Sequence, residues 1–116
     1  MIKKQIDNYL FKTIDKYLEK LRFQNGCFAL NSSRSNYKNV KKISETDLKI
    51  YSQNGEDVII DYLLSSLKIE KPKFIEIGVG DYSESNTRFF FERTSAEGLI
   101  IDIIDDFEKK VKENIK

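Results

Sequence analysis

Histidine is absent from this 116-residue chain, and cysteine occurs once, as Cys27. Without histidine there is no Ser–His or Cys–His nucleophile, no histidine general base and no histidine ligand for a metal. A single cysteine excludes an internal disulfide and a cysteine metal site, and it fits a reducing compartment. We therefore expect neither a histidine-based catalytic pair nor a bound metal within these residues.

An excess of charge of one sign is also lacking, because 20 basic residues oppose 19 acidic ones and the formal net charge is +1. This balance gives no electrostatic reason to expect a nucleic-acid partner. No run of about 18 apolar residues is present to span a membrane, and the basic N-terminus lacks the continuous apolar core of a secretory signal. We expect one soluble, cytoplasmic domain.

The N-terminal segment has apolar residues at helical spacing, which predicts an amphipathic helix of about 20 residues. Asn25 and Gly26 are typical of a helix stop. The apolar stripe favours a core or a face for a partner helix, and less so a membrane surface, because acidic residues interrupt the lysines. The stripe comprises Ile2, Ile6, Leu10, Ile14, Tyr17, Leu18 and Leu21.

The first 50 residues divide by composition into residues 1–30, expected as this helix and a turn, and residues 31–50, expected as a polar linker or loop. Within the first part, residues 27–30 are a possible strand. A second helix should follow residues 51–57, with Ser52 or Asn54 as its cap. Its expected apolar face is formed by Ile60, Leu63, Leu64 and Leu67.

Residues 74–86 carry the strongest pattern in the chain: a short β-branched run, two glycines, and then residues typical of helix starts. A strand, a glycine turn and a helix in that order form the first half of a nucleotide-binding βαβ unit. Gly78 and Gly80 match the first two glycines of the dinucleotide fingerprint, but Ser83 stands at the third. An ordinary glycine-rich turn is the alternative interpretation.

The acidic residues near this turn indicate the charge of its ligand. Asp81 and Glu84 lie close to where a diphosphate would sit, and Glu76, at the end of the strand, would accept hydrogen bonds from a cationic or hydroxyl-bearing group. The pattern therefore suits a positively charged ligand without phosphate. S-adenosylmethionine is such a ligand.

A second parallel-type strand is predicted over residues 98–103, after a helix that starts at Ser83 or Ser85 and runs to about Glu92. Asp102 lies 22 residues after Gly80. In a βαβ unit, a carboxylate at this place contacts the two hydroxyls of an adenosine ribose.

A further helix should follow the second strand. Asp105 and Glu108 have the spacing of a capping box at its start.

Four blocks in this order resemble the FkbM-type S-adenosylmethionine-dependent methyltransferases. They are residues 52–57 (SQNGED), 74–78 (FIEIG), 85–87 (SNT) and 98–102 (GLIID). The resemblance covers about residues 51–116 and implies an α/β, Rossmann-like class I methyltransferase fold. It departs from the family where residues 103–105 replace a proline-containing segment.

The resemblance also implies roles for individual residues. Glu76, Gly78 and Gly80 would surround the methionine portion of the cofactor, and Asp102 would take the ribose hydroxyls. Ser85 and Asn86 would lie at the start of the helix that follows the glycine turn. Gln53 and Asp57 would lie in the segment that covers the cofactor. The predicted cofactor site comprises Glu76, Gly78, Gly80, Asp81, Ser85, Asn86, Asp102, Gln53 and Asp57.

The predicted fold is incomplete, because residues 51–116 supply only the first βαβα unit of a fold that continues through further strands and helices. We expect the N-terminal part of a longer protein; a truncated gene product or a subunit that completes its sheet with another chain are the alternatives. Two parallel strands alone leave unpaired edges that favour association. A homo-oligomer could therefore complete the sheet.

The expected function is methyl transfer from S-adenosylmethionine, directed to an oxygen of a small-molecule or glycan-type acceptor. These residues offer cofactor contacts but no convincing base, so no catalytic residue is named. The alternative from another class is a non-catalytic remnant that acts as an interaction module and self-associates through its long first helix. An NAD-dependent oxidoreductase is disfavoured by Ser83.

Overall fold

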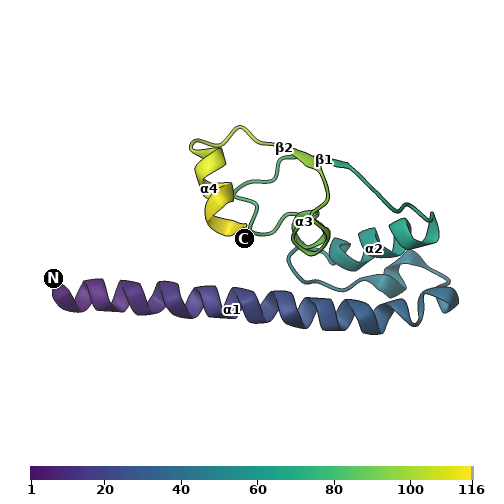
Figure 1. Ribbon diagram of the computed structural model, residues 1–116, viewed down its shortest axis with the longest axis horizontal. Coiled ribbons are helices and arrows are strands. Elements are labelled where there is room, and N and C mark those ends of the chain that lie inside the picture. The colour runs from purple at the N-terminus through teal and green to yellow at the C-terminus, as the bar shows by residue number, and fades with distance from the viewer. Residues whose placement is uncertain (116) are drawn as a thin grey trace.

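The computed structural model describes residues 1–115 and contains a mixed α/β structure. A long helix lies along one side, a small parallel sheet lies on the opposite side, and helix α3 lies between them (Figure 1). The elements are α1 (Ile2–Arg34), two short 3₁₀ helices (Tyr37–Asn39 and Ile43–Thr46), α2 (Glu56–Ser66), β1 (Phe74–Ile77), α3 (Arg88–Thr94), β2 (Gly98–Ile101) and α4 (Phe107–Asn114).

The predicted β–α–β unit is present. Strands β1 and β2 pair in parallel, from Phe74 opposite Gly98 to Ile77 opposite Ile101, and α3 connects them. The α/β class expected from the sequence is therefore confirmed within the described residues. Because both strands run in the same direction, their carboxyl ends meet at one edge, where the glycine turn follows β1 and Asp102 follows β2.

Helix α1 is longer than predicted, with 33 residues, and it passes through Gly26 without stopping. Gly26 is buried, and a Cβ atom there would lie 2.6 Å from Ile50 Cγ2 and 3.1 Å from Phe89 Cε2. The glycine therefore permits close packing between α1 and the body, which the helix-stop interpretation missed. The possible strand at residues 27–30 is wrong, since this segment is helical and buries Leu30.

Residues 31–50, expected as a polar linker, contain the end of α1 and both 3₁₀ helices. Thr46 and Ile50 in this segment are buried. The segment packs back because Ile50 joins the main apolar cluster, where it lies among Leu30, Tyr51, Val58 and Phe89. A mainly polar composition concealed these few anchoring residues.

The later helices also differ from the predictions. Leu63 and Leu67 of α2 are exposed, and its buried face carries Asp57, Val58 and Asp61. Helix α3 begins only at Arg88.

Helix α4 has no side-chain cap, so the predicted capping box is wrong. The N-cap residue of α2 is Gly55, without a side-chain cap, so the prediction of Ser52 or Asn54 as its N-cap is also wrong. The Ser52 hydroxyl still accepts a hydrogen bond from the Asp57 N–H in the first turn of the helix.

The sheet is covered on one face only. On the covered side, Phe74 packs edge-on against Phe90 and Phe91, and Ile100 packs against a second apolar cluster of Val79, Tyr82 and Val111. On the other side, four side chains of the strands are exposed, and these are Ile75, Ile77, Leu99 and Ile101. Parallel sheets are normally buried on both faces.

The helices of residues 1–115 include none with the length and apolar character required to cross a membrane.

Candidate functional site

The glycine turn after β1 is the part of the site that depends most directly on residue type. Gly78 and Gly80 have φ angles of +77° and +58°, in the left-handed region that favours glycine. A Cβ atom at either position would meet nothing within 4 Å. These glycines therefore serve the path of the turn, and they leave open space beside its backbone that a ligand could occupy.

Asp102 joins the end of β2 to this turn. One of its carboxylate oxygens accepts a hydrogen bond from the Gly80 N–H at 2.7 Å, and the other accepts from the N–H groups of Ile103 and Ile104. The bond from Gly80 is the main cause that lowers the pKa of Asp102, since it stabilises the carboxylate. The structure thus places the two strongest sequence signals in direct contact.

Glu76, the acidic residue of β1, is engaged by the protein itself. Its carboxylate accepts hydrogen bonds from the Ser85 hydroxyl at 2.5 Å, from the Asn86 N–H at 2.9 Å, and from both the N–H and the hydroxyl of Thr87. These bonds hold residues 85–87 as a turn, which explains why α3 starts only at Arg88. Any contact between a ligand and Glu76 would have to share these oxygens.

A pocket of about 410 Å³ lies at the carboxyl end of β1, beside this turn. Seven of the nine predicted site residues line it, and Asp57 and Asp102 do not. The Gln53 amide donates to the Glu84 carboxylate at 3.4 Å, which joins the segment before α2 to the segment after the glycine turn. The seven are Gln53, Glu76, Gly78, Gly80, Asp81, Ser85 and Asn86.

The pocket wall is acidic. Four carboxylate residues line it together with neutral polar and apolar groups, and its lining includes neither lysine nor arginine. Hydrogen bonds from the side chain and N–H of Ser83 lower the pKa of Asp81, so this carboxylate remains charged at neutral pH. The wall favours a cationic or hydroxyl-bearing ligand over a phosphate. The four acidic residues are Glu56, Glu76, Asp81 and Glu84.

Asp57 has a structural position. Its side chain is 1% exposed, and one carboxylate oxygen accepts hydrogen bonds from the N–H groups of residues 50–52 and from the Ser52 hydroxyl. Asp57 therefore fixes the turn that leads into α2. It supports Gln53 in the pocket wall through the backbone, and its carboxylate does not line the pocket.

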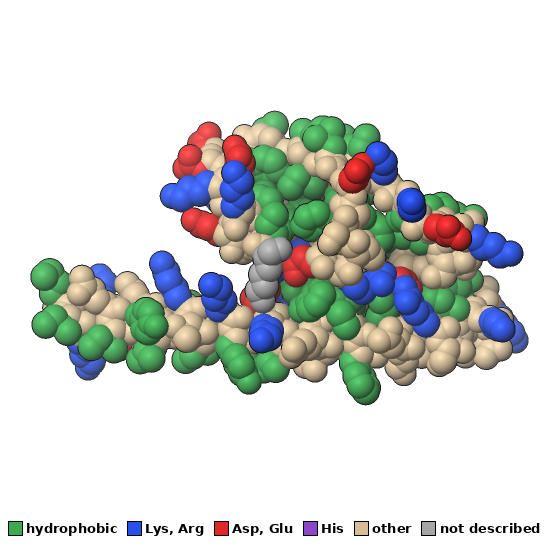
Figure 2. Space-filling view, in the orientation of Figure 1, with side chains coloured by type: hydrophobic (Ala, Val, Ile, Leu, Met, Phe, Trp, Pro, Cys, Tyr) green, Lys and Arg blue, Asp and Glu red, His purple; other side chains and the backbone are tan. Residues whose placement is uncertain are grey.

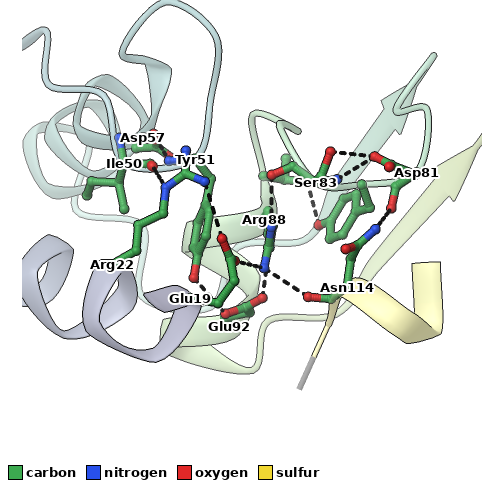
Figure 3. Close-up of polar contacts among 12 residues, drawn as sticks. Glu19, Arg22, Ile50, Tyr51, Asp57, Asp81, Ser83, Arg88, Glu92 and Asn114 are labelled. Atoms are coloured by element: carbon green, nitrogen blue, oxygen red, sulfur yellow. Dashed lines mark hydrogen bonds and ion pairs between the residues drawn. The ribbon is translucent and has the colours of Figure 1, made fainter. Parts of the chain in front are cut away.

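Sequence reasoning missed Arg88, which donates a hydrogen bond to the carbonyl oxygen of Ser83 (Figure 3). Its guanidinium group is buried and donates to Glu19 of α1, to Glu92 of α3 and to the carbonyl oxygens of Ser83 and Asn114, at 2.7–2.9 Å. Ser83 also lines the pocket. No motif marks Arg88, since its role comes from segments distant in sequence.

Tyr51 is the second residue that the sequence did not indicate. Its ring is fully buried, with the guanidinium groups of Arg22 and Arg88 at 4.9 Å and 3.9 Å from its centroid. The Arg22 Nε–H also donates to the Ile50 carbonyl oxygen at 2.6 Å. This stack fastens the turn before α2 to α1 (Figure 3).

Comparisons with protein-family models, with curated proteins and with solved structures found no match to this chain. Within residues 1–115, no group of three or more cysteine and acidic side chains is arranged to hold a metal ion. The pocket's own geometry and charge therefore carry the functional argument.

Proposed function

We propose that the pocket beside the glycine turn binds S-adenosylmethionine, and that the chain is the cofactor-binding portion of a Rossmann-like methyltransferase domain. One observation carries this proposal: a β–α–β unit brings an open turn with two left-handed glycines together with Asp102, the acidic residue directly after the second strand, at one sheet edge. Ligands of open α/β sheets bind at this edge.

The charge of the pocket supports this cofactor over a dinucleotide. A diphosphate needs basic groups or a free helix N-terminus, but the pocket is lined by four carboxylates. The two N–H groups and two hydroxyls of residues 85–87, before α3, all donate to Glu76. A sulfonium ion and an ammonium group, by contrast, gain from nearby carboxylates.

The positions of residues around the pocket indicate which of them would hold the cofactor. The open sides of Gly78 and Gly80 allow close approach to the backbone. Asp81 and Glu84 offer charge at the pocket wall, and Asp102 lies at the strand end where a ribose would be contacted.

When bound, the cofactor supplies an activated methyl group, and the protein positions it against the acceptor. We propose an oxygen of a small molecule or glycan as that acceptor, on the resemblance to the FkbM-type family. This second step is separate from cofactor binding and is tested separately, by transfer of a labelled methyl group to candidate acceptors.

Calorimetric titration of the full chain with S-adenosylhomocysteine tests the cofactor proposal. We expect a dissociation constant in the micromolar range, weakened about tenfold or more by Asp102→Ala, because this change releases the Gly80 N–H and removes a hydrogen-bond acceptor from the site. Asp105→Ala is the matched control, since Asp105 is an exposed acidic residue in the same segment. The affinity of the Asp105→Ala variant for S-adenosylhomocysteine should equal that of the unmodified chain.

Two results would contradict the proposal. A folded chain that binds NADH but not S-adenosylhomocysteine would assign the pocket to a dinucleotide. A folded chain that binds neither compound would remove the cofactor site and leave an interaction module. Circular dichroism of each variant establishes that the chain is folded before titration.

A further inference from the structure

The N-terminal half of α1 carries its apolar side chains away from the rest of the molecule. Every residue from Met1 to Leu18 is exposed. The body packs instead against the opposite side of the helix, at Glu19, Gly26 and Leu30. Figure 2 shows hydrophobic side chains projecting from the outer side of α1. An isolated helix with the length of this half is only marginally stable in water. Packing against a partner would therefore stabilise the N-terminal half of α1.

The spacing on this outer side is that of a coiled coil. Six positions separated by four, three, four, three and four residues form one line along α1, which we call the outer seam: Leu10, Ile14, Tyr17, Leu21, Gln24 and Phe28. Five of these are large apolar residues between 36% and 81% exposed. A repeat of 3.5 residues keeps a seam facing a second helix that crosses at about 20°.

We propose that the outer seam pairs in parallel with the outer seam of a second copy of this chain. A second copy presents the same repeat over the same length, and a polar residue such as Gln24 within a seam fixes the register. The bodies do not obstruct this pairing, because each lies on the side of α1 opposite its seam.

The residues that flank the seam agree with a parallel pair. In that arrangement each residue at one flank faces the residue five positions later in the other chain. Ile6 then faces Phe11, Thr13 faces Leu18, and Lys20 faces Asn25. The first of these pairs places two apolar side chains together, and none opposes like charges.

The available area also fits a dimer. With exposures of 36–81%, the apolar side chains along the outer side of α1 offer about 900 Å² per copy, against about 800 Å² per partner in a standard interface. A membrane surface is less suited, since the polar side of the helix includes Asp15 and Glu19 among its lysines. The counted side chains are Ile6, Leu10, Phe11, Ile14, Tyr17, Leu18, Leu21 and Phe28.

Sedimentation equilibrium of the full chain measures this association. We expect a dimer at micromolar concentrations, and a monomer for the double variant Ile14→Asp/Tyr17→Asp, because two carboxylates would have to be buried in the seam. Ile77→Asp is the matched control: Ile77 is 75% exposed on the open face of the sheet. This variant should remain a dimer.

Cross-linking tests the parallel register without disturbing the apolar residues. Gln24→Cys in a Cys27→Ala background should form an intermolecular disulfide on oxidation, since equivalent seam positions face each other in a parallel pair. Thr13→Cys in the same background is the control and should cross-link far less, because it lies on the flank.

Several outcomes would overturn the proposal. They are a wild-type chain that stays monomeric at high micromolar concentration, a dimer lost in Ile77→Asp but kept in the seam variant, and a dimer that forms no Gln24→Cys cross-link. Binding of the monomer to anionic vesicles would assign α1 to a membrane surface instead. None of these results depends on cofactor binding, so the two proposals fail separately.

Discussion

At the scale of single residues, Arg88 connects more of the molecule than any motif residue does. Its guanidinium group contacts α1, α3, the carbonyl oxygen of Ser83 and the end of α4, and it lies against the ring of Tyr51. The side chains of Arg88 and Glu92 are only 3% and 6% exposed, so this ion pair is shielded from water. Removing a buried cation that makes four hydrogen bonds is costly.

Arg88→Met should therefore lower the free energy of unfolding by about 3 kcal/mol, because it leaves Glu19 and Glu92 without their buried partner. Urea denaturation measures the change. Lys112→Met removes one partner of an exposed ion pair with Glu108 and should change stability by less than about 0.5 kcal/mol. Equal losses in both variants would contradict the role given to Arg88.

Asp61 forms a second buried charge cluster, between α1, α2 and α3. Its carboxylate accepts two hydrogen bonds from Arg34, one from the Tyr37 hydroxyl and one from Arg93. Burial acts to raise the pKa of Asp61, but the hydrogen bonds and charges of these partners outweigh it and the pKa is lowered.

This shift predicts acid sensitivity. The unfolded chain binds the Asp61 proton at a higher pH than the folded chain, so the contribution to stability is complete above about pH 4 and is lost as the pH falls through the lowered folded value. Urea denaturation of the wild type and of Asp61→Asn at a series of pH values measures it. The stability difference between them should shrink on acidification, and a constant difference would contradict the prediction.

At the scale of elements, the site was more predictable than the helix ends. β1, β2 and the glycine turn follow from short local patterns, since β-branched runs and glycines act within a few residues. Helix ends were missed where distant contacts decide them: Gly26 remains helical because α1 packs on Ile50, and α3 starts late because Glu76 holds the segment before it. One sequence carries no direct sign of such contacts.

Gly26→Ala should destabilise the protein by about 1 kcal/mol. The added methyl group would press on Ile50 and Phe89, at a cost that exceeds the gain of up to about 1 kcal/mol in helix propensity. Thermal unfolding measures the effect. Asn31→Ala, at an exposed position of the same helix, should be neutral or stabilising. A higher stability of Gly26→Ala would contradict the prediction, because it would show that Ile50 and Phe89 move aside at little cost.

At the scale of the whole molecule, the chain is extended, with dimensions of 57 × 30 × 21 Å. Two apolar surfaces lie on opposite sides of it: the outer seam of α1 and the open face of the sheet. The sequence indicated both, as an amphipathic stripe and as two parallel strands without neighbours. It could not indicate that they point away from each other, because this depends on how α3 separates the sheet from α1.

This separation gives the two surfaces independent roles. A partner at the outer seam would leave the open face of the sheet uncovered, and parallel strands with uncovered faces and edges favour further association. The Ile77→Asp variant distinguishes the two surfaces directly, which is why it serves as the control for the seam.

The burial of Tyr51 has an optical consequence. The chain has no tryptophan and six tyrosines, so phenol groups dominate its near-ultraviolet spectrum. Burial is the main cause that raises the pKa of Tyr51, and its ring touches both Arg22 and Arg88. Opening of the junction between α1 and the turn before α2 would expose this phenol to ionisation. Burial also raises the pKa of Tyr37 and Tyr82, so the difference in tyrosinate absorbance between the wild type and Tyr51→Phe in an alkaline titration is the signal that reports whether that junction is closed.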